Sequence, residues 1–293
     1  MNGFFFGLGY SAQATIDALR ADETGGLTLA GTSRSAEAVA RLANGGIAAH
    51  VFDGEQPGAT LGADLRGASH VVSSIAPSAG ADPVLARHRD DLDRAGGLEW
   101  LCYYSTVGVY GDFGGAWIDE TATRHPVNQR SRDRVAVEQY WQDYAAARGV
   151  PLLILRLSGI YGPGRSSFDK LLDGTARRIV KKGQVFNRIH VEDIGRVTAL
   201  AAQRRLGGTF NLTDDLPAPP QDVVEFAAAL EGTEPPPEVA FETAEMTPMA
   251  RSFYSDNKRV SNAAIKKALG IELLYPSYRE GLTAIFTQHE LFR

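Results

Sequence analysis

The sequence predicts an α/β fold in which helices cover both faces of a parallel sheet. Short, nearly continuous apolar runs alternate with amphipathic stretches through the first half of the chain. A glycine-containing turn directly follows the first apolar run and precedes an amphipathic stretch. Strands that are buried on both faces have this apolar character, and helices usually connect parallel strands. We therefore expect a Rossmann-type, doubly wound parallel sheet followed by a smaller C-terminal substrate lobe.

The expected strands are short apolar runs bounded by turn residues. They cover residues 3–6, 27–32, 48–52, 70–75, 98–105 and 151–157. Amphipathic spacing predicts helices over residues 11–20, 36–43 and 131–148. Beyond about residue 160 the pattern loosens, and prolines gather at 217–220 and 235–237. We expect residues 1–160 to form the nucleotide-binding domain and residues 161–293 to form mainly the substrate lobe, with some segments returning to the first domain.

Composition restricts the classes of partner. The 293 residues carry a formal net charge of −5, so we expect no nucleic-acid surface, which requires clustered lysine and arginine. Cys102 is the single cysteine, which excludes an internal disulfide and fits a reducing compartment. The apolar start at residues 4–6 is too short for a signal sequence, and no stretch has the length of a membrane span. We therefore expect a cytoplasmic protein without a membrane partner.

The first turn, Gly7-Leu-Gly9-Tyr10-Ser11-Ala12, fits the pattern G-x-G-x-x-A. Gly7 allows the tight turn, Gly9 lets the backbone approach a pyrophosphate, and Ala12 lets the helix pack closely on the strand. The N-terminus of the helix adds donors and a favourable dipole for phosphates. A plain strand-to-helix turn also uses glycine. The position between a strand and a helix favours dinucleotide binding by these residues, with Tyr10 and Ser11 among the contacts.

The end of the second strand bears on which dinucleotide is bound. An NAD-binding protein usually has a carboxylate there for the ribose 2′-hydroxyl, whereas this chain has Thr32-Ser33-Arg34. A hydroxyl and a guanidinium suit the 2′-phosphate of NADP, so Ser33 and Arg34 predict NADP, with NAD as the alternative if Arg34 is only a surface residue. Asp53, after the third strand, either bonds to the adenine or forms a turn with Gly54. Ile75 and Ala76, at the end of the fourth strand, complete the expected cofactor contacts.

Further segments follow in a characteristic order along nearly the whole chain. They are Ser105-Thr-Val-Gly-Val-Tyr110-Gly111, Asp119-Glu120 before Pro126, Leu155-Arg-Leu-Ser-Gly-Ile-Tyr161-Gly162-Pro163, Arg188-Ile-His190-Val-Glu-Asp193 and Phe210-Asn211-Leu. Together with the glycine turn, they resemble the extended short-chain dehydrogenase/reductases, the NAD-dependent epimerase/dehydratase group.

The resemblance implies a catalytic set of a Ser or Thr, a Tyr that transfers a proton, and a Lys four residues after the Tyr. Thr106 matches the first role. Counting back from Glu138 places Arg134 at the Lys position and Arg130 at the Tyr position, so the chain resembles an atypical member that lacks Tyr-x-x-x-Lys. A guanidinium stays protonated and cannot act as an ordinary general acid or base.

Arg130 and Arg134 are four residues apart and share one face of a helix, which Ser131 is expected to cap. Two arginines facing the nicotinamide would favour an anionic ligand, such as a carboxylate or a phosphate. The alternative is a solvated face within the arginine-rich residues 130–134. Both interpretations fit the sequence.

His190 is the remaining titratable candidate for proton transfer, because its ordinary pKa lies near neutrality. The resemblance places its segment beside the substrate lobe, where it is usually architectural. We expect Asp193 to cap a helix over residues 194–202. The tyrosines offer no clear replacement donor: Tyr103 and Tyr104 belong to the expected core, Tyr110 and Tyr161 to turn motifs, and Tyr140 lies off the face of the two arginines.

Two functions follow from these residues. The first is an NADP-dependent oxidoreductase or epimerase acting on a small, polar, anionic substrate such as a nucleotide sugar or sugar acid. The second is a catalytically inactive NADP(H)-binding sensor or interaction module, since a fold does not imply catalysis. A zinc or covalent enzyme has little support, because the histidines are scattered and no G-x-S-x-G elbow occurs. The resemblance also implies a homodimer formed through residues 85–92 and 135–144.

Overall fold

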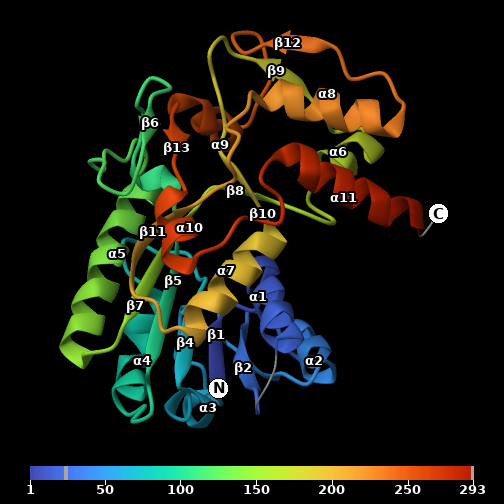
Figure 1. Ribbon diagram of the computed structural model, residues 1–293. Helices are drawn as coiled ribbons and strands as arrows, with labels where there is room; N and C mark the ends of the chain where they lie inside the picture. Colours follow the sequence, from blue (N-terminus) through green and yellow to red (C-terminus); the bar gives the residue numbers. More distant parts are fainter. Residues whose placement is uncertain (23–25, 292–293) are drawn as a thin grey trace. The chain divides into compact units, whose positions relative to one another are not determined.

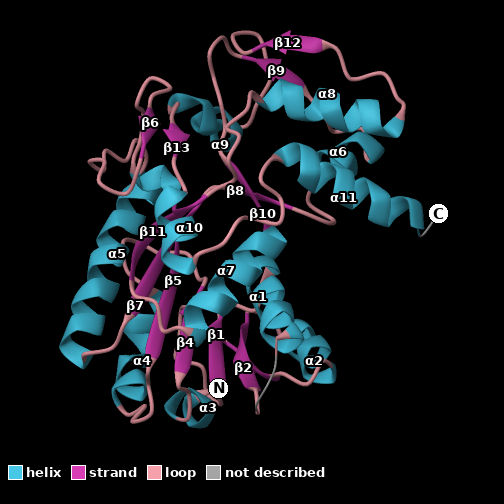
Figure 2. Cartoon of the chain, viewed as in Figure 1, coloured by secondary structure: helices cyan, strands magenta, loops and turns pink. Residues whose placement is uncertain are grey.

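The computed structural model describes residues 1–22 and 26–291, and Figures 1 and 2 show its helices and strands. The strands of the main sheet are β1 (Asn2–Phe6), β2 (Thr28–Ser33), β3 (Ala48–Val51), β4 (His70–Ser73), β5 (Trp100–Thr106), β7 (Leu152–Leu157) and β11 (Gly208–Leu212). They form a seven-stranded sheet in the order β11-β7-β5-β4-β1-β2-β3. β1 runs parallel to both β2 and β4, β2 to β3, and β4 to β5. The predicted Rossmann-type α/β fold is confirmed.

The helices packed on this sheet follow its strands in the chain. They are α1 (Tyr10–Ala21), α2 (Ala36–Asn44), α3 (Gly62–Arg66), α4 (Pro83–Asp93), α5 (Gln129–Arg148) and α7 (Val191–Gln203). Each predicted strand and helix has an observed counterpart, with ends that differ by at most two residues except at the start of α7, which begins three residues before the predicted 194. The strand predicted over 70–75 ends at Ser73, and the helix predicted from Ser131 begins at Gln129. Ser131 therefore lies inside α5 and is not its N-cap.

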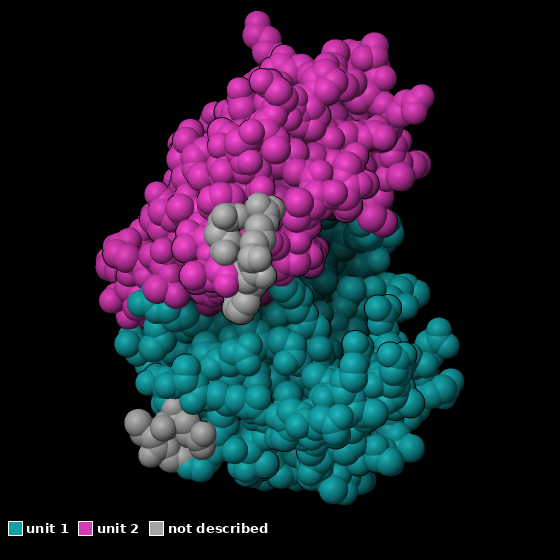
Figure 3. All heavy atoms as spheres, turned by 90° about the vertical axis from the view of Figure 1, so that its right-hand side faces the viewer, with its two compact units in different colours: residues 1–106, 129–156, 194–210 teal, residues 107–128, 157–193, 211–293 magenta. Residues whose placement is uncertain are grey.

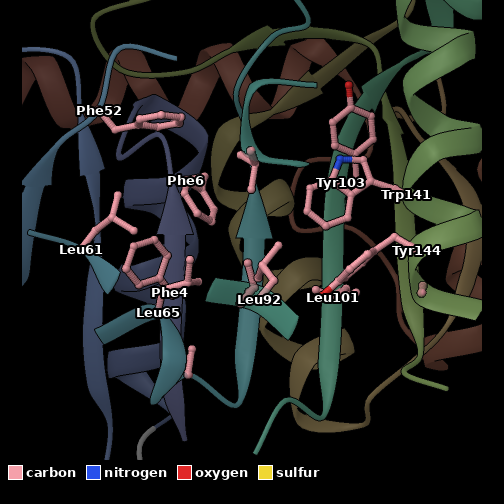
Figure 4. Close-up of a cluster of buried hydrophobic side chains, with 14 of the residues drawn as sticks. Phe4, Phe6, Phe52, Leu61, Leu65, Leu92, Leu101, Tyr103, Trp141 and Tyr144 are labelled. Atoms are coloured by element: carbon pink, nitrogen blue, oxygen red, sulfur yellow. The ribbon is translucent and has the colours of Figure 1, made fainter. Parts of the chain in front are cut away.

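The three phenylalanines of β1 alternate between the two faces of the sheet, because successive side chains of a strand point to opposite sides. Phe4 and Phe6 are fully buried in a cluster with residues from α3, α4 and α5. Figure 4 shows this cluster, in which Leu101 and Tyr103 of β5 repeat the same alternation. Apolar burial on this scale is the main stabilising contribution to such a sheet.

The opposite face of the sheet is covered by α1 and α7. The Tyr104 hydroxyl of β5 lies 2.7 Å from the Thr15 hydroxyl of α1 and donates to Thr198 Oγ1 of α7 at 2.9 Å. A Cβ atom on Gly195 would overlap the backbone of Ala14, so the glycine permits the close approach of α7 to α1. The buried hydroxyls satisfy one another, which avoids the cost of an unpaired polar group.

The chain divides into two compact units, coloured teal and magenta in Figure 3. The first comprises residues 1–106, 129–156 and 194–210, and the second comprises residues 107–128, 157–193 and 211–293. The chain therefore passes between the units several times. The boundary expected at residue 160 lies near one of these crossings, and the roles assigned to the two parts stay a prediction.

The second unit is built from short elements. Its strands are β6 (Trp117–Ile118), β8 (Gly159–Tyr161), β9 (Arg178–Val180), β10 (Arg188–His190), β12 (Glu238–Ala240) and β13 (Arg259–Val260). Its helices are α6 (Ser167–Leu172), α8 (Pro220–Glu231), α9 (Pro248–Ser252), α10 (Ala263–Leu269) and α11 (Tyr278–Leu291), with 3₁₀ turns at Val107–Val109 and Phe253–Ser255. Residues of α6, α8 and α11 share one apolar cluster around Phe168, Ala227 and Leu282. A separate apolar cluster of the same unit contains Ile179, Ala244 and Tyr254.

Candidate functional site

The strand order places a topological switch point at β1 in the first unit. The chain leaves β1 toward β2 on one side and later returns to β4 on the other. In open parallel sheets, ligands bind beyond the carboxyl ends of the strands at such a point. Every predicted site residue except His190 belongs to this unit, and most of them follow the carboxyl ends of β1 to β5.

The glycine turn after β1 is held in a conformation that favours glycine. Gly7 has φ +87°, and a Cβ there would lie 2.7 Å from Ser74 Oγ. The Gly7 N–H donates to Thr32 Oγ1 at 3.0 Å, and Ser74 Oγ donates to the Gly7 carbonyl at 2.7 Å. The turn is therefore fixed to the ends of both neighbouring strands.

Gly9 leaves open space at the N-terminus of α1. A Cβ built on Gly9 meets no atom within 4 Å, and Gly9 caps α1 without a side-chain hydrogen bond. Tyr10 and Ser11 are the first residues of the helix, and Ala12 is buried at 1% exposure. Backbone donors at such a terminus, together with the helix dipole, suit a phosphate. Packing within the protein therefore does not require a glycine at position 9.

Hydroxyl residues at and just after the end of β2 have different roles. Thr32 is buried and serves the glycine turn, while Ser35 Oγ caps α2 by accepting from Ala38 N. Arg34 is exposed and makes no hydrogen bond or ion pair with any residue in 1–22 or 26–291. Its guanidinium is thus available to an anionic group of a ligand.

Asp53 and the residues after β4 also lie at this edge. Asp53 Oδ1 accepts from Glu55 N at 2.8 Å, which forms the turn that was one of the two sequence interpretations. Asp53 Oδ2 has no such role in the turn. Ile75 is half-buried and Ala76 is exposed, just beyond Ser73.

A buried ion pair joins α5 to β5 and β7. Arg156 donates from Nε and Nη2 to Glu138 at 3.0 and 2.7 Å, and Ser105 Oγ donates to the same carboxylate at 2.6 Å. Glu138 is 0% exposed and Arg156 is 5% exposed. This network fixes the strand end that carries Thr106, which is half-buried. Sequence analysis did not select Arg156, although a charged residue inside the apolar run of 152–157 is a signal of a buried pair.

Arg134 and Arg130 both lie within α5, and their surroundings differ. Arg134 Nη1 donates to Tyr103 Oη at 2.9 Å and to the Tyr104 carbonyl at 2.5 Å. Among the described residues, its Nε and Nη2 have no acceptor. Arg130 is exposed in the first turn of the helix. Arg134 is therefore positioned against β5 with donors to spare.

His190 lies in the second unit, at the end of β10. It is 1% exposed, and its ring packs against Tyr161 and Tyr275 with centroid distances of 5.1 and 4.0 Å. Nδ1 accepts from Glu192 N at 3.3 Å, so Nε2 carries the proton of the neutral ring. Burial lowers the pKa of His190 to about 4. A histidine that stays neutral in this way is a poor general acid near neutrality.

Asp193 does not have the position of a helix cap. α7 begins at Val191, and the Asp193 carboxylate accepts from Leu274 N at 2.8 Å and from Tyr275 N at 3.0 Å. The expected cap is wrong because the helix starts earlier and the carboxylate binds the loop before α11.

The segments that carried the family resemblance meet within the second unit. Tyr110 Oη donates to Asn211 Oδ1 at 2.7 Å, and Asn211 N donates to Glu120 Oε1 at 2.8 Å. Tyr161 Oη donates to the Ser277 carbonyl at 3.3 Å. Tyr103, Tyr104, Tyr110 and Tyr161 are all buried, as expected for structural residues, while Tyr140 is 48% exposed.

Possible metal ligands and membrane-spanning helices are two further properties of the chain, given for the described residues only. Across residues 1–22 and 26–291, no three His, Cys, Asp or Glu side chains are grouped so as to hold a metal ion. Within the same part of the chain, no helix has both the length and the apolar character required to cross a membrane.

Comparison with known proteins decides the family. The sequence model of the NAD dependent epimerase/dehydratase family matches residues 21–213. The chain belongs to the NAD-dependent epimerase/dehydratase family. The matched segment begins after the glycine turn, so the turn adds evidence that is independent of the match.

Solved structures share the fold. A conserved protein of unknown function from Silicibacter pomeroyi DSS is 44% identical with a TM-score of 0.86, over 98% of this chain and 99% of that one. UDP-glucuronic acid 4-epimerase from Bacillus cereus, in complex with UDP-glucuronic acid and NAD, shares the fold at 17% identity and a TM-score of 0.77, over 100% of both chains. No curated protein matches the sequence.

Proposed function

We propose that this family member is an NADP(H)-dependent oxidoreductase or epimerase that acts on a small, polar, anionic substrate such as a sugar acid or nucleotide sugar. The observation that carries the proposal is the dinucleotide cradle of the first unit. Gly7 supports the turn, Gly9 leaves room that a side chain would fill, and Arg34 offers an unpaired guanidinium. These residues fit a pyrophosphate and a 2′-phosphate.

NADP rather than NAD is the finer part of the proposal. The edge of β2 carries Ser33 and Arg34 without the carboxylate that would repel a 2′-phosphate. Asp53 remains a candidate contact for the adenine through Oδ2, and Ile75 and Ala76 for its flank. Two structures described as complexes with NAD are only 16% and 17% identical to this chain, so they support dinucleotide binding and leave the preference to experiment.

The chain's own residues have limited but defined roles in the reaction. When bound, the nicotinamide supplies or accepts a hydride. Thr106 orients the carbonyl or alcohol of the substrate, and the free donors of Arg134 hold the ribose or an anionic substrate group. We assign the proton to water, because Arg130 and Arg134 cannot release one and the neutral His190 ring is enclosed.

Turnover measurements test this function directly. NADPH oxidation is followed with aldehydes, ketones, sugar acids and nucleotide sugars, and NADP⁺ reduction with the matching alcohols. We expect turnover with an anionic member of the panel, and a loss of about a hundredfold in kcat for Thr106→Ala because one hydrogen bond to the reacting oxygen is removed. Thr106→Ser is the matched control and should keep most of the activity. Failure of every substrate would contradict the enzymatic assignment.

A second function is favoured by the arginine at position 130, where the family resemblance implies a tyrosine. In this alternative, the protein binds NADP(H) without catalysis and reports its redox state to a partner protein. Pull-downs from lysate with NADPH, with NADP⁺ and without either test it. The alternative requires a partner whose capture changes with the nucleotide, and turnover without such a partner rules it out.

Location and assembly are further parts of the proposal. The buried thiol of Cys102 and the lack of a disulfide fit a reducing compartment, so we expect the cytoplasm. We also expect a homodimer through α4 and α5, where Tyr140 is exposed. Light scattering of the purified protein measures the assembly.

A further inference from the structure

The second unit contains a buried carboxyl group with no partner for one of its oxygens. Asp214 is 1% exposed, and its Oδ1 accepts from Leu216 N at 3.3 Å. Oδ2 is buried and has no hydrogen-bond partner among the described residues. A buried polar atom in this state requires an explanation, since almost all such atoms are paired in folded proteins.

Asp214 is held beside Arg188 by the backbone. Asp214 N donates to the Arg188 carbonyl at 2.6 Å, and Thr213 Oγ1 donates to the same oxygen at 3.1 Å. Arg188 lies on β10, which pairs in parallel with β8. The two side chains therefore extend from adjoining backbone positions, and they form no ion pair within the described residues.

Arg188 uses only one of its nitrogens within the protein. Nη1 donates to the carbonyls of Phe186 at 3.0 Å and Ala218 at 3.1 Å. In residues 1–22 and 26–291, Nε and Nη2 have no acceptor. The residue as a whole is partly exposed, although burial lowers the pKa of its guanidinium. A guanidinium with two adjacent free donors is suited to bind two oxygens of a carboxylate or phosphate.

The protonation of Asp214 determines what the pair can bind. Burial raises the pKa of Asp214 to about 8, against the opposing effect of Arg188. The carboxyl is therefore neutral at pH 7 and offers an O–H donor. The other charged or titratable groups that act on the pair are Asp215, Asp222, Glu280, Tyr161, Tyr254 and Tyr278. Lys266 pairs with Asp215, and the Ser277 hydroxyl donates to Glu280, so two of the three carboxylates have partners of their own.

We propose that Arg188 and Asp214 form an anion-binding subsite of the second unit, in which Nε and Nη2 of Arg188 and the carboxyl O–H of Asp214 bind the carboxylate or phosphate of the substrate. This subsite rests on the proposed function for its role, because it selects the anionic substrates assigned there. Its existence as a binding site is tested separately from cofactor binding and turnover.

The experiment titrates the full chain with inorganic phosphate and with glucuronate at pH 6.5 and pH 9, by calorimetry and by thermal shift. Arg188→Lys keeps a positive charge but loses the two-pronged geometry, and we expect at least a tenfold weaker affinity for the anion. Arg177→Lys is the matched control, because Arg177 is an exposed arginine of the same unit that donates to the Glu245 carbonyl. Phosphate bound at the glycine turn is unaffected by either substitution, so only binding that depends on Arg188 is scored.

Asp214 should make anion affinity depend on pH, which a purely structural role would not do. Wild-type affinity for glucuronate, whose own carboxylate is ionised at both pH values, should fall between pH 6.5 and pH 9 as the Asp214 carboxyl ionises. Asp214→Asn, which keeps a neutral donor, should bind glucuronate equally at both pH values. Anion binding that is unchanged in Arg188→Lys, or absent from the wild type, overturns the subsite. NADPH titrations of the same variants keep the two proposals apart: unchanged NADPH binding with lost anion binding supports the subsite, and lost NADPH binding in the wild type contradicts only the cofactor proposal.

Discussion

Gly7 and Gly9 belong to the same turn, but we expect alanine to be unfavourable at each position for a different reason. Substituting each in turn distinguishes an effect on folding from an effect on ligand binding. Gly7→Ala places a side chain at φ +87° and against Ser74 Oγ, so we expect a loss of about 1–3 kcal/mol in the free energy of unfolding, together with weak NADPH binding. Gly9→Ala meets no protein atom and should fold normally, yet its methyl group occupies the space assigned to the pyrophosphate. Urea unfolding and NADPH titration of both variants measure this difference. Normal NADPH affinity in Gly9→Ala would contradict the predicted cradle.

Asp214 makes stability depend on pH in a direction fixed by its raised pKa. The unfolded carboxyl has a pKa of about 4, and the folded one of about 8. The stabilisation that comes from the bound proton is complete below the unfolded value and is lost as pH rises through the folded value. Asp214→Asn does not titrate, so its stability relative to wild type should increase between pH 4 and pH 8. Urea unfolding at both pH values checks this, and a constant difference would mean that Asp214 is ionised in the native state.

At the scale of elements, the Glu138–Arg156 pair holds α5 against β5 and β7. Glu138→Gln leaves a buried guanidinium without its countercharge, and we expect a loss of about 3–5 kcal/mol in stability. The double variant Glu138→Gln, Arg156→Met removes both charges and should regain most of that loss. Glu99→Gln breaks the exposed pair with Arg205 and should cost less than about 1 kcal/mol. Denaturant unfolding of the wild type, the two single variants and the double variant measures these free energies of unfolding. Equal losses of stability in Glu138→Gln and Glu99→Gln would show that burial does not strengthen the Glu138–Arg156 pair.

Most strands and the longer helices of the first unit could be predicted from sequence, whereas α3, with five residues, and β11 were not. β1, β5 and β7 are apolar runs, and α1 and α5 carry amphipathic spacing. In the second unit, β8, β9 and β10 have three residues each, and no periodicity can be detected over that length. The start of α5 was predicted two residues late because Ser131 fits the preference for a cap and yet lies inside the helix.

In the candidate site, too, residues that act through their local sequence could be predicted, whereas residues whose role depends on distant parts of the chain could not. The glycine turn and the exposed Arg34 follow from local sequence, since each acts through its own backbone or charge. Asp214 could not be selected, because its orphaned oxygen depends on burial by residues distant in the chain. The carboxylate of Asp193 was likewise misassigned, because its partners lie about eighty residues later. Long-range packing decides these roles, and single-sequence patterns do not report it.

At the scale of the whole molecule, the two units share one interleaved chain. The first unit needs residues 194–210, because Thr198 of α7 binds Tyr104, and the Leu206 carbonyl accepts from Trp100 Nε1. A chain truncated after residue 160 should therefore lack a cooperative unfolding transition, although it contains every strand that sequence analysis predicted. Circular dichroism with thermal unfolding checks this. A sharp transition in the truncated chain would show that residues 1–160 fold independently.

The central claim is that the glycine turn and Arg34 bind NADP(H), and parallel calorimetric titrations with NADPH and NADH test it most directly. Arg34→Ala is compared with Arg41→Ala, which removes another exposed arginine from the far end of α2. We predict that wild type and Arg41→Ala prefer NADPH, and that Arg34→Ala loses this preference by about tenfold or more, since a charge-assisted bond to the 2′-phosphate is removed. Preference for NADH in the wild type, or NADPH affinity unchanged in Arg34→Ala, would contradict the account.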